Sequence, residues 1–453
     1  MLGIGIWQGR RAAAAPLPKD ADVVVVGAGA AGIAAARRVM AANRKVVVLE
    51  ATDRVGGRCQ TDLTTFGVPF DRGAHWMYLQ DSNPVAKLAR SVGIDVYTSP
   101  QNQRIRIGRR NARSGEVEDY LATLVRANRA IADAVRNRPD LAASEALPRD
   151  LGPWASTLGF VIGPAATGKD LKEVSALDLA RAEPRDAGAF CRQGLGTLIA
   201  KLAEPVPVAL STPVTRLSWN GRTLDIETAS GHLSPRAVIV TASTAVLASG
   251  DLKFTPDLPK RQLDAIAKLG LGSFDRIALE LADNPLGMQH DDVVIEQSES
   301  DRTALLVANI GNTALCTVDV GGSFGRALTA QSDNTMVGFA VEWLTRLYGS
   351  DLRAALKRRA VTRWNAAPFV QGAMSAAAVG GQGARKVLME PMNDVFFAGE
   401  AIHETLWGTV GGAWESGERA ADAVLRRIGA LKEPAPETPV RKRRRKGQTE
   451  ANG

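Results

Sequence analysis

An α/β fold built on a parallel sheet is predicted by two features of the first fifty residues. Val23–Val26 is a continuous apolar run, which is typical of a strand buried on both faces. The glycine cluster of VVVVGAGAAG follows at once, and the small residues of 30–40 then predict a helix. A second apolar run over 45–49 ends at Glu50. This order of strand, tight turn, helix, strand and acid predicts a Rossmann-type dinucleotide-binding domain.

Each glycine of the cluster has its own physical reason. Gly27 permits the tight turn, Gly29 lets the backbone approach a pyrophosphate, and Gly32 lets the helix pack closely on the strand. The helix N-terminus offers free N–H groups to the phosphates, and the acid after the second strand can accept hydrogen bonds from ribose hydroxyls. The candidate contacts at this end are Gly27, Gly29, Ala30, Ala31, Gly32, Glu50 and Ala51.

A second glycine-rich stretch predicts a further backbone approach to the bound cofactor, in addition to the contacts of the first motif. ATDRVGGRCQT over 51–61 places Gly57 and Arg58 just past the acid, where backbone and guanidinium can approach a bound cofactor. DRGAHWM follows over 71–77. From these stretches the candidate contacts are Gly57, Arg58, Gly73, Ala74, His75 and Trp76.

These motifs resemble those of the FAD-dependent amine oxidases, the flavin monoamine oxidase and polyamine oxidase group. VFFAGEAIHETLWGTVGGAWESGERAA over 395–421 is similar to the closing FAD motif of that family, and RAVIVTAS and FTPDLP, over 236–243 and 254–259, are similar to its middle segment. The resemblance implies FAD as cofactor, bound by a Rossmann-type domain that is discontinuous in sequence, with an α+β substrate domain of sheet and helices.

The resemblance also assigns roles near the far motif. It implies that Gly399 and Glu400 contact the ribityl and phosphate region, and that a helix beginning within 408–412 points its N-terminus at the flavin. Gly408, Thr409 and Val410 are therefore candidate contacts. It further implies a backbone contact from Val214 to the adenine, although Val214 fits a core position equally well, and it places Trp364 either beside the flavin or in the core.

Three departures from the family bear on the reaction. Arg276 stands where the family has an active-site lysine; it either holds a water near the flavin or pairs with a carboxylate such as Asp275 or Glu280. Met374 and Thr409 stand where many members carry two aromatic side chains that flank the amine. Ala373 replaces the cysteine of covalently flavinylated members, so we expect noncovalent FAD.

His75 would lie near the flavin, because it belongs to the GAHW stretch. Two interpretations remain for its ring. It orients substrate and exchanges protons, or it is satisfied by backbone groups on the cavity wall. Together with Arg276, Trp364, Met374 and Thr409, it completes the candidate residues around the reacting atoms.

The predicted organisation divides the chain into four parts, two of them discontinuous in sequence. The FAD-binding domain takes residues 21–77, 191–254 and 386–431, and the substrate domain takes 78–190 and 255–385. Residues 1–20 form either a leader or the remnant of an export signal, which leaves the compartment as cytoplasmic or, with a lost twin-arginine signal, periplasmic. Residues 432–453 form a basic tail predicted to be disordered, with seven basic and three acidic residues that give +4 of the net +8.

The composition of the chain argues against several classes of binding partner. Cysteines and histidines lack metal-ligand spacing, so we expect no metal. No apolar run reaches the roughly 18 residues of a membrane helix, and the folded part is too mildly basic to indicate a nucleic acid partner. The oligomeric state is not indicated.

Three functions fit the sequence. In the first, hydride transfer from an amine to flavin N5 gives an imine, and molecular oxygen is the acceptor that yields hydrogen peroxide. In the second, the enzyme dehydrogenates or desaturates a non-amine substrate and uses another acceptor. In the third, the chain is a non-catalytic flavoprotein whose tail binds partners.

Overall fold

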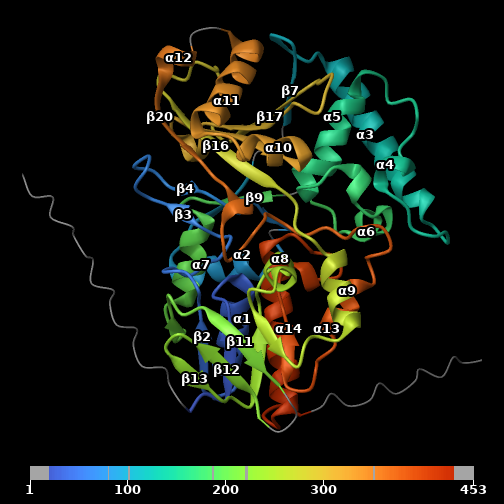
Figure 1. The fold of residues 1–453 in the computed structure, drawn as a ribbon. Coiled ribbons are helices and arrows are strands. Elements are labelled where there is room, and N and C mark those ends of the chain that lie inside the picture. Colours follow the sequence, from blue (N-terminus) through green and yellow to red (C-terminus); the bar gives the residue numbers. More distant parts are fainter. Residues whose placement is uncertain are drawn as a thin grey trace, which may run out of the picture.

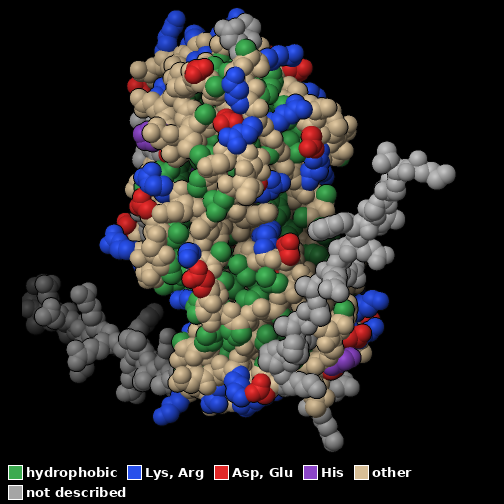
Figure 2. Space-filling view, turned by 90° about the vertical axis from the view of Figure 1, so that its left-hand side faces the viewer, with side chains coloured by type: hydrophobic (Ala, Val, Ile, Leu, Met, Phe, Trp, Pro, Cys, Tyr) green, Lys and Arg blue, Asp and Glu red, His purple; other side chains and the backbone are tan. Residues whose placement is uncertain are grey.

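The computed structural model describes residues 20–79, 81–99, 103–185, 188–219, 223–349 and 352–432. Two lobes stack on one another, and the chain crosses between them several times (Figure 1). The predicted leader and basic tail lie outside the described residues, apart from Asp20 and Lys432 at their edges. Figure 2 shows Lys and Arg side chains interspersed with Asp and Glu over one face.

A five-stranded parallel sheet forms the centre of the lower lobe in Figure 1. Its order is β10 (Val208–Ala209), β2 (Val46–Leu49), β1 (Val23–Val26), β14 (Ala237–Val240) and β21 (Val395–Phe397). Residues of β1, β2, β14 and β21 are buried on both faces, as their unbroken apolar runs predict. The carboxyl ends of these strands therefore meet along one edge, where ligands bind in such sheets.

Helices cover one face of this sheet, and a small sheet covers the other. On the first face α1 (Ala30–Ala41) packs against α14 (Val410–Arg427), and a Cβ on Gly417 would lie only 2.1 Å from the carbonyl oxygen of Ala31. The second face packs against a four-stranded sheet of β13 (Gly231–Leu233), β12 (Asp225–Thr228), β11 (Val214–Ser218) and β15 (Lys253–Thr255). This arrangement confirms the predicted α/β fold class.

The upper lobe contains a seven-stranded mixed sheet. Its order is β20 (Leu356–Val361), β16 (Phe274–Leu281), β19 (Leu315–Gly321), β18 (Leu305–Ala308), β17 (Asp292–Glu296), β7 (Gln103–Ile107) and β8 (Arg110–Asn111). Alternate residues of β16, such as Ile277 and Leu279, pack with α11 (Asp333–Tyr348) in one apolar core. The other face of β16 is thus free to carry polar side chains toward the lower lobe.

The other helices and strands range from 2 to 21 residues in length. The remaining helices are α2 (Pro84–Ala89), α3 (Ser114–Ala134), α4 (Ala143–Ala146), α5 (Ala155–Phe160), α6 (Ala176–Arg181), α7 (Leu195–Ala203), α8 (Thr244–Ser249), α9 (Lys260–Lys268), α10 (Gly322–Thr329), α12 (Leu352–Ala355) and α13 (Ala384–Met389). The remaining strands are β3 (Thr61–Asp62), β4 (Phe70–Asp71), β5 (Met77–Tyr78), β6 (Val96–Thr98) and β9 (Gly188–Cys191). None of the helices in the described ranges is long and apolar enough to cross a membrane.

Candidate functional site

The glycine loop between β1 and α1 has the geometry of a cradle. Gly27 has a φ of +103°, and a Cβ on Gly32 would lie 1.9 Å from the Gly27 carbonyl oxygen, so neither position admits a larger residue without movement. Gly29 caps α1 without a side-chain hydrogen bond, and no protein atom lies within 4 Å of where its Cβ would stand. The N-terminus of α1, at Ala30 and Ala31, therefore lies next to open space at Gly29.

The loop that begins at Ala51 closes against this cradle. The N–H of Gly56 donates to the carbonyl of Ala28 over 2.8 Å, and a Cβ on Gly57 would lie 3.3 Å from the Cα of Gly29. The two glycine-rich stretches thus meet, as expected if both contact one cofactor.

Glu50 is fixed at the end of β2. Its buried carboxylate accepts the N–H of Ala28 over 2.7 Å and both the N–H and the hydroxyl of Thr52, over 2.9 and 2.7 Å. The backbone carbonyl of Glu50 accepts the N–H of Thr212 over 2.7 Å, which brings Val214 and the start of β11 to the same edge. The sequence-predicted acid and Val214 therefore lie in one region.

Arg58 and Glu400 tie the first and last motifs together. The Arg58 guanidinium donates to Glu400 over 2.8 Å and to the carbonyl of Ala373 over 2.6 Å. Glu400 also accepts the hydroxyl of Ser375 over 2.6 Å and the N–H of Gly408 over 2.7 Å. Burial opposes ionisation of Glu400, but the Arg58 charge and these hydrogen bonds outweigh it and lower its pKa.

The N-terminus of α14 is built on Thr409. Its hydroxyl accepts the N–H of Gly412 over 3.0 Å and donates to the carbonyl of Leu406 over 2.6 Å, so it is engaged as the helix cap. Gly408 has a φ of +70°, and a Cβ there would lie 3.5 Å from the Cβ of Met374. Met374 thus lies against Gly408, the residue before Thr409, and Val410 is buried as the first residue of the helix.

His75 is held by a carboxylate and not by the backbone. Its Nδ1 lies 2.8 Å from the Asp71 carboxylate, its ring stacks on Phe190 at 4.3 Å, and its buried Nε2 has no hydrogen-bond partner in the described part of the chain. Burial opposes ionisation of Asp71, but hydrogen bonds from His75, Thr61 and the Leu195 N–H hold the pKa below its usual range. Because an ionised carboxylate only accepts, Nδ1 carries the proton and Nε2 is the open position.

Arg276 pairs across the sheet with a residue that the sequence analysis missed. The register of β16 and β19 sets it opposite Asp319, with 3.6 Å between Nε and the carboxylate, and its Nη1 donates to the carbonyl of Asp71 over 3.1 Å. Arg276 thus faces a carboxylate, as one of the two interpretations had it, but the partners named there are wrong: Asp275 lies on the other face of the strand, and Glu280 pairs with an arginine of β20. An acid within the apolar run 315–321 was the available signal.

Trp364 packs against the DRGAHWM stretch. Its indole N–H donates to the carbonyl of Arg72 over 3.0 Å, and a Cβ on Gly73 would lie 2.9 Å from the indole ring. Beyond Ala74 the ring of Trp76 lies parallel to that of Tyr78, with 6.4 Å between the centroids. Aromatic side chains therefore lie in this region, but they belong to Trp76 and Tyr78, just before and within β5. They do not come from the positions that the family resemblance implies.

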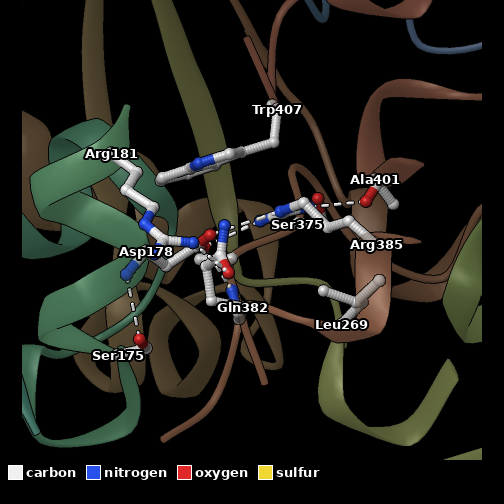
Figure 3. A network of polar contacts seen from close by, with 12 residues as sticks. Ser175, Asp178, Arg181, Leu269, Ser375, Gln382, Arg385, Ala401 and Trp407 are labelled. Atoms are coloured by element: carbon white, nitrogen blue, oxygen red, sulfur yellow. Dashed lines mark hydrogen bonds and ion pairs between the residues drawn. The ribbon is translucent and has the colours of Figure 1, made fainter. Parts of the chain in front are cut away.

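A buried network supports the far motif, as Figure 3 shows. Arg385 and Asp178 are fully buried and joined by two hydrogen bonds of 2.7 and 3.2 Å, and Asp178 also accepts the N–H of Ala377 over 2.8 Å. Arg385 donates further to the carbonyl of Ala401 and lies 5.2 Å from the ring centre of Trp407. Through these contacts α6 holds the segments on either side of Glu400 in place.

A surface cavity of about 610 Å³ lies away from all of these groups. It is lined by Leu281, Asn284, Met288, Gln289, His290, Asn309, Asn312, Thr313 and Ala314, at the loops of the seven-stranded sheet. None of these is a sequence-predicted site residue. No cluster of three or more His, Cys, Asp or Glu side chains within the described ranges could hold a metal ion.

Comparison with known proteins agrees with this geometry. The family model "Flavin containing amine oxidoreductase" matches residues 30–425. Lysine-specific histone demethylase 2 of Homo sapiens is 28% identical, over 90% of this chain and 54% of that protein, so the chain spans about half of its length. Probable polyamine oxidase 4 of Arabidopsis thaliana is 26% identical, over 90% of this chain and 88% of that protein.

The fold comparison points the same way. Cyclohexylamine oxidase from Brevibacterium oxydans superposes with a TM-score of 0.77 at 20% identity, over 90% of this chain and 100% of that chain. A putrescine oxidase bound to putrescine superposes with a TM-score of 0.78 at 18% identity, over 90% of this chain and 99% of that chain. These neighbours show the fold, and because the family model matches residues 30–425, the chain belongs to the family of flavin-containing amine oxidoreductases.

Proposed function

We propose that this flavin enzyme binds FAD noncovalently and oxidises a C–N bond of an amine, with oxygen as the electron acceptor. Two observations together carry the proposal. The glycine loop between β1 and α1 leaves open space for a nucleotide, and the buried Nε2 of His75 has no hydrogen-bond partner among the described residues. On this proposal, the residues that bind the cofactor and those that contact the substrate are adjacent, as an oxidase requires.

The described residues fit FAD. Open space lies before α1 at Gly29 and again at Gly399, whose φ is +142° and whose Cβ would meet no atom within 4 Å. Glu50 would accept the ribose hydroxyls, and the N-terminus of α14 would face the flavin ring. Ala373 offers no thiol for a covalent link, so acid precipitation should release all of the flavin into the supernatant.

Two glycine variants separate cofactor binding from folding. We expect Gly32→Ala to lower both stability and FAD content, because its Cβ would meet the Gly27 carbonyl at 1.9 Å. Gly29→Ala should keep wild-type stability without cofactor, since its Cβ meets no protein atom, yet weaken FAD binding about tenfold or more. Unfolding of the apoprotein and FAD titration measure the two effects. Unchanged FAD affinity in Gly29→Ala would contradict the assignment.

FAD supplies the two-electron chemistry when it is bound. The chain's own task is to hold the amine neutral and close to the cofactor. His75 accepts the proton of the incoming ammonium at Nε2, while Asp71 fixes the tautomer and stabilises the charged ring. Bound FAD would accept the hydride from the α-carbon and pass the two electrons to oxygen, giving hydrogen peroxide, and water would hydrolyse the imine product.

Arg276 keeps a positive charge where the family resemblance implies a lysine, but it cannot serve as a base. Its guanidinium is held by Asp319 and the carbonyl of Asp71, close to His75. This substitution favours a second candidate, a dehydrogenase whose electrons leave to an acceptor other than oxygen.

Anaerobic stopped-flow reduction with an amine panel tests these functions. The panel includes polyamines, aryl amines, cyclic tertiary amines and amino acids, and air is admitted after reduction. Bleaching with rapid recovery supports the oxidase, and bleaching with slow recovery supports the dehydrogenase. Absence of bleaching by every member would sink the amine proposal and favour a non-amine substrate or a non-catalytic flavoprotein.

The remaining partners follow from composition. We expect a small-molecule substrate and no nucleic acid partner for the folded part, because the chain without its basic tail is only mildly basic. The compartment, cytoplasmic or periplasmic, depends on residues outside the described ranges, and fractionation of the native protein would decide it.

A further inference from the structure

Arg185 is a half-buried arginine that has no role in the amine oxidation proposed above. Its Nη1 donates to the carbonyl of Ala166 over 3.0 Å and its Nη2 to the carbonyl of Trp407 over 2.5 Å. The guanidinium carbon lies 4.6 Å from the ring centre of Trp407 and 5.8 Å from that of Tyr78. Its Nε is buried and has no partner within the described ranges.

The charge of Arg185 is uncompensated among the described residues. Glu400 and Asp178 are the carboxylates whose fields reach it, but each already pairs with another arginine, Arg58 and Arg385. Burial lowers the pKa of Arg185, although a guanidinium remains protonated in proteins. A half-buried guanidinium that has no carboxylate of its own favours an anion beside it.

Arg185 stands beside the positions that replace the family's aromatic pair. A Cβ on Gly408 would lie 3.8 Å from its Nη2 and 3.5 Å from the Cβ of Met374. The Arg185 guanidinium and Met374 thus both lie against Gly408, next to the positions where the resemblance implies aromatic rings. Such a fork matches a carboxylate and repels an ammonium group.

We propose that Arg185 determines specificity by binding a carboxylate of the amine substrate. The substrates are then amino acids or N-substituted amino acids, and not di- or polyamines. This inference rests on the proposed amine oxidation, since it names the substrate class of the same site. Tyr78, whose ring lies beside the guanidinium, would bound the space that receives the carboxylate.

Matched substrate pairs that differ only in the carboxylate test the inference on the FAD-loaded protein. Lysine against cadaverine and phenylalanine against phenethylamine are suitable pairs, measured as anaerobic flavin reduction. We expect the acid of each pair to be preferred. Arg185→Gln should raise KM for the acids about 10- to 100-fold and leave the plain amines unchanged or improved.

Two further variants keep the test clear. Arg185→Lys retains the charge but not the fork, so it should lose about tenfold and serves if Arg185→Gln does not fold. Arg181→Gln is the matched control, because this exposed arginine of α6 donates only to Gln382 among the described residues. A wild-type preference for the plain amines, or equal losses for both members of a pair, would overturn the inference.

A binding measurement separates this inference from the proposed function. Titration with benzoate, followed by the visible spectrum of the bound flavin, needs no turnover. A spectral shift that Arg185→Gln abolishes supports the carboxylate site even if no amine reduces the flavin. A wild-type protein that does not bind benzoate and also fails to distinguish the substrate pairs contradicts it.

Discussion

Two buried arginine–aspartate pairs in the described part of the chain are built differently. Arg385 and Asp178 meet over 2.7 Å through two hydrogen bonds, and both side chains have further backbone partners. Arg276 and Asp319 are 3.6 Å apart, and neither Asp319 oxygen has a hydrogen-bond partner among the described residues. The Arg385–Asp178 pair holds segments together. The Asp319 carboxylate instead has unused hydrogen-bonding capacity near His75, which is typical of a functional site.

The comparison predicts its largest effect at the satisfied pair. Arg385→Met leaves the Asp178 carboxylate buried without its counter-ion, so we expect the free energy of unfolding to fall by about 3–5 kcal/mol. Denaturant unfolding of the FAD-loaded protein measures it. The double variant Asp178→Leu/Arg385→Met should recover most of the loss.

An exposed pair provides the control for this prediction. Arg427 and Asp394 meet over 2.7 Å at the surface, and Arg427→Met should change stability by less than about 1 kcal/mol. Equal losses at Arg385 and Arg427 would show that burial does not distinguish the pairs.

Neither buried pair could be predicted from the sequence, for a physical reason. Asp178 and Arg385 are 207 positions apart, and Arg276 meets Asp319 only through the register of two strands. The strands of the parallel sheet and the glycine loops could be predicted, because each is a contiguous pattern whose meaning is local. Residues that act by meeting across the fold carry no such pattern, and Arg185 was missed for the same reason.

Asp275, buried on the face of β16 opposite to Arg276, should make the stability of the protein depend on pH. Burial outweighs the hydrogen bonds from the Trp364 N–H and the Thr362 hydroxyl and raises the pKa of Asp275 to about 6. A raised carboxyl pKa contributes stability below the unfolded value near 4, and this contribution is lost as pH rises through about 6. We expect a loss of about 2–3 kcal/mol over that window.

Asp275→Asn removes this titration while keeping an oxygen for the two donors. Melting temperatures of wild type and variant, compared between pH 4 and pH 8, measure the effect. The variant should gain on the wild type as pH rises. A constant difference across the range would show that Asp275 is not a titrating group of this window.

A small stability effect is expected at the Arg276–Asp319 pair. Arg276→Met/Asp319→Leu replaces two charged groups that lie 3.6 Å apart with apolar groups, so the free energy of unfolding should stay within about 1 kcal/mol of wild type. The same change removes the positive charge beside His75, and we expect reoxidation of the reduced enzyme by air to slow about tenfold or more. Arg276→Lys keeps the charge and should reoxidise at least as fast as wild type. Stopped-flow mixing with aerated buffer measures all three proteins. If the double variant lost stability as Arg385→Met does and kept its reoxidation rate, the pair would be structural, and the distinction between the two buried pairs would not hold.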